Sequence, residues 1–338
     1  MTKKILYLGD PHAQVSNLHE VTRLTDFVLD TAAEKGVAAI CIVGDLFHNH
    51  AVIRLEVLDF WTRFFKKAAE RKIKIIAMAG NHDKPGSTDK DHMTAISVFK
   101  YWRTEFVTVV DTPTTISELG IDFMPYFRNE SDLLEAMRQA HGKTGNKCVV
   151  AHQTFTGAQY ENGFYDKDAI DPAEVPYQQV VSGHIHMAQA IDKVLYVGTP
   201  KWDTMSDANQ HKGFSILEHG KDGLYDPEKS ERVSTAGVCT PIKTFVVLEE
   251  CKDEVPKMDK NDRNHVTLVG SSDWIKKMKK KIGDGARIKV KPTDSLSSKV
   301  KDEVALSNID EFLRSFETLN QVDKKRVIEY IKRLGGAS

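Results

Sequence analysis

The chain has 338 residues, of which 41% are hydrophobic and 28% charged, with a formal net charge of −1. This is the composition of an ordinary globular protein, so collagen-like, coiled-coil and disordered chains are excluded. No apolar run near the start is long enough for a membrane span or a signal peptide, and we expect a cytoplasmic protein without membrane contact. The length predicts one large domain with a smaller one, or two of comparable size.

The two parts of the chain differ in charge. Residues 1–240 hold 26 basic and 32 acidic residues, whereas residues 241–338 hold 21 and 16. A basic C-terminal part favours contact with a polyanion, which the acidic N-terminal part would repel unless divalent cations lie in it. The four cysteines include no Cys-x-x-Cys pair, which argues against a disulfide framework and against a thiolate zinc site.

Short apolar strands alternate with amphipathic helices over the first 200 residues. Helices are predicted at 18–36, 55–71 and 131–140. Strands are predicted at 4–8, 38–43, 73–79, 106–110, 121–124, 147–151, 178–182 and 194–197. This alternation predicts a layered α/β domain, in which ligands bind outside the carboxyl ends of the strands.

The chain after residue 220 has a different pattern. Residues 221–242 are rich in Gly, Lys, Asp and Ser and are expected at the edge of the first domain. A strand at 265–270, a helix at 273–282 and a strand at 286–291 then predict a small α+β domain. The predicted division is 1–240, 241–292, a serine-bearing linker at 293–305, and C-terminal helices at 306–338.

Metal-binding or acid–base side chains follow five of the predicted strands. They occur as Asp10-Pro11-His12, Gly44-Asp45-Leu46-Phe47-His48, Gly80-Asn81-His82-Asp83, Ala151-His152 and Gly183-His184-Ile185-His186. Because loops at the carboxyl ends of strands converge on one edge, these groups are expected to share a cleft. Oxygen and imidazole ligands without thiolates suit manganese, iron or zinc, and manganese is our first choice.

Each motif alone has a simpler explanation. Histidines at strand ends are often only hydrogen-bonded, and Gly44-Asp45 or Asn81-His82-Asp83 is also typical of a turn. All five motifs in this order, each on a strand end, favour a site for two metal ions. Such a pair can clamp a phosphate and activate a water molecule.

In this order, the motifs resemble those of the calcineurin-like metallophosphoesterase superfamily. Three segments, 44–48, 124–126 and 196–200, are similar to the double-strand-break repair nucleases, namely SbcD-type subunits and the recombination endonuclease subunits of large phages. The resemblance covers residues 3–215 by motif and implies an α/β/β/α core with a small capping domain and C-terminal helices. The compact length and the Gly-Gly-Ala-Ser ending favour a phage subunit, which would act in the host cytoplasm.

The resemblance implies a role for each motif residue. One ion is expected on Asp10, His12, Asp45 and His186, and the second on Asp45, Asn81, His152 and His184. It also implies that His82 is the catalytic histidine that protonates or stabilises the leaving oxygen, that Asp83 orients its ring, and that His48 lies beside the substrate phosphate.

The function implied is manganese-dependent DNA hydrolysis in repair or recombination. The expected activities are 3'–5' double-strand exonuclease and single-strand endonuclease, largely independent of base sequence. The implied assembly is a homodimer within a heterotetramer that includes an SMC-like ATPase. Any ATP dependence must come from that partner, because the chain has no Gly-x-x-x-x-Gly-Lys-Ser/Thr loop.

The C-terminal third contains two further candidate surfaces. Basic residues crowd the predicted helix 273–282 and the strand after it, which predicts either a solvated surface or a DNA-backbone contact: Lys276, Lys277, Lys279, Lys280, Lys281, Arg287, Lys289 and Lys291. The apolar residues Ile309, Phe312, Leu313 and Phe316 share one helix face and predict core packing or docking to the ATPase.

Two alternatives remain open from the sequence. One is a stand-alone metallophosphoesterase that acts on small phosphodiesters or phosphoproteins. The other is a non-catalytic scaffold that binds DNA ends. The predicted C-terminal cap and helices argue against the first alternative, and the intact ligand set with His82 argues against the second.

Overall fold

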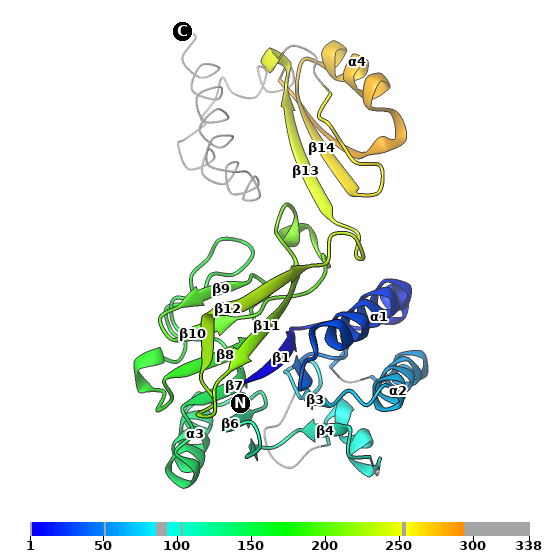
Figure 1. Ribbon diagram of the computed structural model, residues 1–338. Coiled ribbons are helices and arrows are strands. Elements are labelled where there is room, and N and C mark those ends of the chain that lie inside the picture. The colour runs from blue at the N-terminus through cyan, green and yellow to red at the C-terminus, as the bar shows by residue number, and fades with distance from the viewer. Residues whose placement is uncertain (1, 51, 86–92, 103, 252–254, 294–338) are drawn as a thin grey trace. The chain divides into compact units, whose positions relative to one another are not determined.

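The structure is a computed structural model that describes residues 2–50, 52–85, 93–102, 104–251 and 255–293. The chain forms two compact units, shown in Figure 1 and described separately below. The first comprises Met1–Trp202 and His211–Cys239, and the second comprises Asp203–Gln210 and the described chain from Thr240. The predicted linker, apart from Thr293, lies outside the described residues. So do the predicted C-terminal helices with Ile309, Phe312, Leu313 and Phe316.

The first unit contains two six-stranded mixed sheets. The first sheet has the order β12-β11-β1-β2-β3-β4, in which β1 to β4 are parallel and β11 pairs antiparallel with β1. Its strands are β1 (Lys3–Leu8), β2 (Ala39–Val43), β3 (Ile75–Met78), β4 (Val107–Val110), β11 (Gly213–His219) and β12 (Tyr225–Ser234).

The second sheet has the order β5-β6-β7-β8-β10-β9, with β6, β7, β8 and β10 parallel. Its strands are β5 (Thr114–Ile116), β6 (Ile121–Met124), β7 (Cys148–His152), β8 (Gln179–Gly183), β9 (Gln189–Ile191) and β10 (Val194–Tyr196). The short outer strands β5 and β9 pair antiparallel with their neighbours.

The two sheets pack face to face with helices outside them. Tyr7 and Met78 of the first sheet share a buried cluster with Phe123 and Val150 of the second. Figure 1 shows α1 (Leu18–Lys35) and α2 (Leu55–Glu70) beside the first sheet. On the second sheet, α3 (Glu130–Thr144) buries three of its residues in one cluster with strand residues of β7 and β8. The four-layer α/β/β/α core expected from the sequence is thereby confirmed.

Local sequence explains where these helices begin and end. The side chain of Asn129 accepts hydrogen bonds from the backbone N–H groups of Ser131 and Asp132, which caps the start of α3. Gly36 ends α1 with a left-handed backbone, φ 61°, that suits glycine. Among the described residues, no helix is long and apolar enough to cross a membrane.

The second unit is a three-stranded parallel sheet covered by one helix. The sheet order is β13-β14-β15, formed by β13 (Ile242–Leu248), β14 (Arg263–Gly270) and β15 (Arg287–Pro292). The helix α4 (Ser272–Ile282) buries Trp274, Ile275 and Met278 against one face of the sheet. The predicted strand–helix–strand pattern is confirmed, and β13 is an additional strand.

Short 3₁₀ helices complete the described chain. They are η1 (Val15–Asn17), η2 (Ala95–Tyr101), η3 (Pro172–Glu174), η4 (Met205–Asp207), η5 (Glu249–Cys251) and η6 (Gly283–Gly285).

The layer between the two sheets gives the first prediction. Phe123 is fully buried there, so Phe123→Ala should lower the free energy of unfolding by about 3–5 kcal/mol, through lost apolar burial and the cavity left behind. Urea denaturation measures this loss. The control Leu55→Ala changes a residue that is 77% exposed and should shift stability by no more than about 0.5 kcal/mol; equal losses in both variants would contradict the packing described.

Candidate metal centre

The ends of β1, β2, β3, β7 and β8 bring the candidate side chains together in the first unit. Asp10 and His12 follow β1, Asp45 follows β2, and Asn81 and His82 follow β3. His152 is the last residue of β7, and His184 and His186 follow β8. Residues from both sheets therefore meet at one edge, as the strand order of each sheet requires.

The backbone of this site is strained at four of the candidate residues. Asp10, His12, Asp45 and His184 have positive φ angles of 37°, 43°, 52° and 76°. Such conformations cost about 1–3 kcal/mol each in residues other than glycine and are concentrated at functional sites. Hydrogen bonds hold them here, since His12 N–H donates to the Asp45 carbonyl over 3.0 Å and His184 N–H donates to Asp10 Oδ1 over 3.0 Å.

Two glycines leave the space in which the loops approach each other. A Cβ atom on Gly44 would lie 2.1 Å from Nδ1 of His152, and one on Gly80 would lie 2.1 Å from Oδ1 of Asp45. Gly44 also has a φ of 98°, which side-chain-bearing residues rarely adopt. Glycine is therefore needed at both positions to bring the functional side chains together.

A first group of ligand atoms comes from Asp10, His12 and His186, which all lie within 4.8 Å of one another. The Nε2 atoms of His12 and His186 are 3.1 Å apart, and Asp45 Oδ2 lies 3.7 Å from His12 Nε2. Oδ2 of Asp10 is buried and has no hydrogen-bond partner. A buried carboxylate oxygen without a donor fits a divalent cation, because a cation would replace the missing partner.

A second group lies on the other side of Asp45. Oδ1 of Asn81 is 3.0 Å from His152 Nε2 and 2.8 Å from His184 Nδ1, while Asp45 Oδ1 is 3.5 Å from His152 Nε2. Nδ1 of His152 donates to the Val43 carbonyl over 2.7 Å, which leaves its Nε2 for the site. The two oxygens of Asp45 thus face one group each.

Burial and neighbouring charges set the protonation of these groups. Burial raises the pKa of Asp10 to about 6 and lowers the pKa of His184 to about 3, which keeps this imidazole neutral. Burial alone would also raise the pKa of Asp45, but His152 and His12 hold this pKa well below its usual range. A neutral imidazole and an ionised carboxylate are the forms that bind metal ions, and His184 and Asp45 are held in these forms. In contrast, the Asp45 and Asp10 carboxylates raise the pKa of His152 to about 9, so this ring must lose a proton when a metal ion binds.

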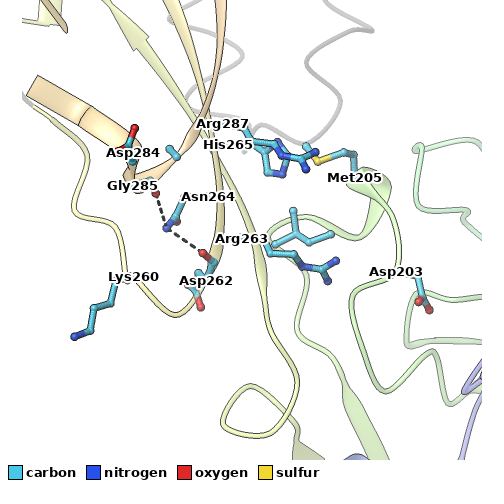
Figure 2. Close-up of a pocket in the computed structure, with 12 residues that line it drawn as sticks. Asp203, Met205, Lys260, Asp262, Arg263, Asn264, His265, Asp284, Gly285 and Arg287 are labelled. Carbon is cyan, nitrogen blue, oxygen red and sulfur yellow. Dashed lines mark hydrogen bonds between the residues drawn. The ribbon is translucent and has the colours of Figure 1, made fainter. Parts of the chain in front are cut away.

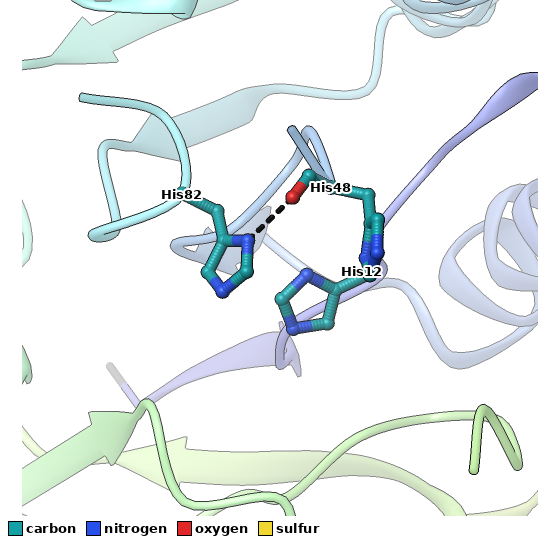
Figure 3. Close-up of side chains that lie close together, drawn as sticks. All are labelled: His12, His48 and His82. Atoms are coloured by element: carbon teal, nitrogen blue, oxygen red, sulfur yellow. Dashed lines mark hydrogen bonds between the residues drawn. The ribbon is translucent and has the colours of Figure 1, made fainter. Parts of the chain in front are cut away.

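His82 lies beside the first group, with His12 and His48 around it (Figure 3). Its backbone N–H donates to Asp45 Oδ1 over 2.8 Å, and its ring Nδ1 donates to the His48 carbonyl. The ring stacks on His50 with 4.0 Å between centroids. These contacts hold the imidazole in place and leave Nε2 available for a substrate.

Asp83, which the resemblance expects to orient the His82 ring, contacts the backbone of two neighbouring loops in the structure. The buried Asp83 carboxylate accepts hydrogen bonds from the backbone N–H groups of Leu46, Phe47 and Gly80, at 3.2, 3.0 and 2.9 Å. The His48 carbonyl accepts from Nδ1 of the His82 ring, and an orienting role for Asp83 stays a prediction. Asp83 therefore joins the loop after β2 to the loop after β3.

Sequence motifs missed one acidic residue at this site. Oε1 of Glu161 lies 3.3 Å from Nδ1 of His186. A carboxylate on the outer nitrogen of a histidine fixes the ring so that the other nitrogen faces a ligand. Glu161 comes from the long loop between β7 and β8, where no motif or strand end marks it.

The predicted basic residues lie in the second unit, on two faces of its sheet. Lys276, Lys277, Lys279, Lys280 and Lys281 are exposed on α4. Ile288 and Val290 of β15 pack with α4, so the alternating residues Arg287, Lys289 and Lys291 lie on the opposite face. The basic residues of the helix and those of the strand therefore lie on different faces of the unit.

Arg287 also lines a pocket of about 700 Å³ within the second unit (Figure 2). His265 and Arg263 line it as well, with the acidic Asp203, Asp262 and Asp284. Burial lowers the pKa of His265, and the charges of Arg287 and Arg263 lower it further. The pocket therefore combines a cluster of positive charge with nearby carboxylates.

The close approach at Gly44 gives the second prediction. Gly44→Ala places a methyl group where His152 Nδ1 lies and disfavours the required backbone angle, so manganese affinity should fall at least tenfold, as measured by isothermal titration calorimetry. The control Gly142→Ala adds a methyl group in open space within α3 and should leave this affinity unchanged while raising stability by about 0.5–1 kcal/mol. Unchanged manganese affinity in Gly44→Ala would contradict the packing argument.

Comparisons with known proteins agree with this geometry. The model of the family described as calcineurin-like phosphoesterase matches residues 3–188. The chain is 26% identical over 231 residues to "Putative phosphoesterase 078R" of Invertebrate iridescent virus 3, covering 66% of this chain and 64% of that protein. It is 25% identical over 225 residues to "Exonuclease subunit 1" of Enterobacteria phage T4, covering 64% of each.

A third relative is "DNA double-strand break repair protein Mre11" of Halobacterium salinarum, 25% identical over 238 residues, with 66% of this chain and 58% of that protein covered. Each of these three matches covers less than two thirds of the relative's own length. Calcineurin-like phosphoesterases hydrolyse phosphoester bonds with divalent metals, and the Asp and His groups described above suit such ions. By its matched residues, its α/β/β/α core and this site, the chain belongs to the calcineurin-like phosphoesterase family.

Proposed function

We propose that the chain is the nuclease subunit of a DNA repair or recombination complex. It would hydrolyse phosphodiester bonds with two divalent metal ions, of which manganese is the preferred choice. One observation carries the proposal: Asp45 faces two separate ligand groups while His82 keeps a free ring nitrogen beside one of them. The names of the phage T4 and Halobacterium relatives support DNA as the substrate. The expected activities are 3'–5' double-strand exonuclease and single-strand endonuclease.

The distances support the following ligand sets. One ion would bind Asp10, His12, Asp45 and His186, and the other would bind Asp45, Asn81, His152 and His184. When bound, two such ions neutralise charge on a phosphate and make a coordinated water acidic enough to attack near neutral pH.

The chain's own residues would then handle the leaving group. His82 Nδ1 already donates to the His48 carbonyl, so only Nε2 can pass a proton to the leaving oxygen. Burial lowers the pKa of His82, whereas the Asp45 carboxylate raises it; an approaching phosphate would further favour the protonated ring. His48, whose ring centroid is 5.5 Å from that of His12, would contact the substrate phosphate.

This arrangement holds phosphate rather than base edges, so cleavage should be largely independent of sequence. In the second unit, the exposed lysines of α4, or the opposite face with Arg287, Lys289 and Lys291, would contact the DNA backbone. Arg287 is favoured as a phosphate contact because it lines a pocket with three other basic residues, Lys260, Arg263 and His265.

The assembly remains a proposal from the sequence pattern. The segment 306–338 would bind an SMC-like ATPase, and the chain would form a homodimer within a heterotetramer. The name of the phage T4 relative, "Exonuclease subunit 1", supports a multi-subunit complex.

His82→Ala tests the chemical step. The variant should still bind manganese, because His82 is not in either proposed ligand set, but its rate of DNA cleavage should fall by about 10²–10⁴-fold through loss of the proton donor. The assay uses end-labelled linear duplex and circular single-stranded DNA with manganese, and metal content is measured in parallel.

The matched control is His211→Ala, which removes an exposed histidine of the same unit and should retain full activity. Loss of bound manganese in His82→Ala would contradict its assignment to the leaving group. A wild-type protein that hydrolyses a small chromogenic diester but leaves both DNAs intact would instead support a stand-alone phosphoesterase.

Two triple variants separate the basic faces of the second unit. Arg287/Lys289/Lys291→Ala should weaken duplex binding and flatten its salt dependence by about one unit of slope per lost phosphate contact. Lys276/Lys277/Lys280→Ala, which removes the same number of positive charges from α4, should have a smaller effect if the sheet face is the main contact. Filter binding over a range of salt concentrations measures both, and the reverse ranking would assign the contact to α4.

A further inference from the structure

A short hairpin beside the candidate metal centre exposes two aromatic side chains. Gln159 and Tyr165 pair as an antiparallel bridge, and a tight turn joins them. Within this turn, Tyr160 N–H donates to the Phe164 carbonyl over 2.8 Å and Gly163 N–H donates to the Tyr160 carbonyl over 2.9 Å. Phe164 is 60% exposed and Tyr165 is 58% exposed. We call residues 159–165 the aromatic hairpin.

Contacts on one side join the aromatic hairpin to the loop that carries His184 and His186. The Gln189 side chain accepts from Gln159 N–H over 2.9 Å and donates to the Gln159 carbonyl over 2.7 Å. Glu161 lies in the turn itself and contacts His186 at 3.3 Å. The hairpin is therefore attached at two points to the segment that bears two of the candidate ligands.

Contacts on the other side join it to the chain that follows His152. The hydroxyl of Tyr160 lies 3.5 Å from Thr154 Oγ1 and donates to Asp166 Oδ2 over 2.9 Å. The other oxygen of Asp166 accepts from the backbone N–H groups of Asp168 and Ala169. A loop held in this way can present an aromatic ring to a ligand with little further loss of conformational entropy.

The position of the two rings points to the substrate strand as their ligand. A phosphodiester held at the metal centre brings its neighbouring nucleotides to the adjacent surface, and Phe164 and Tyr165 lie on a hairpin that contacts His186. Two side chains are too few for a protein-docking patch of several hundred Å². Each is, however, large enough to stack on a base, and such stacking does not depend on base identity.

We infer that the aromatic hairpin stacks Phe164 and Tyr165 on unpaired nucleobases next to the phosphodiester being cleaved. The inference rests on the proposed function and adds a preference for strands whose bases are unpaired, such as single strands, frayed ends and hairpin loops. Paired bases in a duplex are already stacked on one another, so the hairpin would favour substrates that have lost this pairing.

The test uses the full chain and the double variant Phe164→Ala/Tyr165→Ala. A single-stranded oligonucleotide that contains 2-aminopurine is bound in calcium and then cleaved in manganese. Wild type should quench the 2-aminopurine fluorescence, and the double variant should lose this quenching and show a KM for single-stranded DNA raised about tenfold or more. Turnover of a small chromogenic diester, which has no base, should be unchanged.

Two controls separate stacking from a structural effect. Tyr101→Ala, which removes an aromatic residue that is 80% exposed in η2, should behave as wild type, and Phe164→Trp with Tyr165 intact should retain quenching. An oligonucleotide with abasic sites around the cleaved bond should be cut equally by wild type and the double variant.

The outcomes keep this inference distinct from the proposed function. If wild type and double variant show equal quenching and equal KM, the inference is overturned. Continued DNA cleavage by both proteins would leave the proposed nuclease function standing. An equal defect on abasic and normal strands also overturns the inference. The protein could instead bind single strands, with quenching that requires both rings, but not cut them. That result would uphold the stacking and refute the proposed nuclease function. A wild type that binds no single strand would overturn the inference.

Discussion

The first unit depends on burying Asp45 between two groups of ligand atoms. A carboxylate in a low-dielectric interior is expensive unless it is paired. Here its oxygens lie 3.7 Å from His12 Nε2 and 3.5 Å from His152 Nε2, and the backbone N–H of His82 donates to it. An imidazole from the loop after β1 and one at the end of β7 thus meet a carboxylate from the loop after β2. The sandwich of two sheets is what brings these three strand ends within reach of one another.

The surrounding backbone allows the two histidines to lie close to Asp45. Four non-glycine residues at the site have positive φ angles, and Gly44 and Gly80 leave room that a Cβ atom would fill. The buried Asp83 carboxylate satisfies three N–H groups of the loops after β2 and β3. Hydrogen bonds and the packing of both sheets thus offset the local backbone strain, as is common at functional sites.

Much of the core was predictable because its strands are short, apolar and buried on both faces. The predicted strands 38–43 and 121–124 match β2 and β6 closely, and the end of β2 carries one of the five motifs. In contrast, β12 was not predicted. It lies in the polar stretch expected only to be a domain edge, and an exposed outer strand carries no apolar alternation that would reveal it. The motif residues could be named from sequence, but Glu161 could not, since its contact with His186 is set by a long loop. The three backbone donors to Asp83 could not be named for a related reason: sequence adjacency to His82 does not fix where a carboxylate finds its donors.

The pairing of β1 has a consequence for how the chain is made. This first strand lies between β2 and β11, and Lys3 is paired with His219. During synthesis β1 can pair early with β2, but its other edge stays open until more than 200 further residues have left the ribosome. An unpaired strand edge is a template for association with other chains. One edge of β1 therefore stays open to such association until β11 has been made.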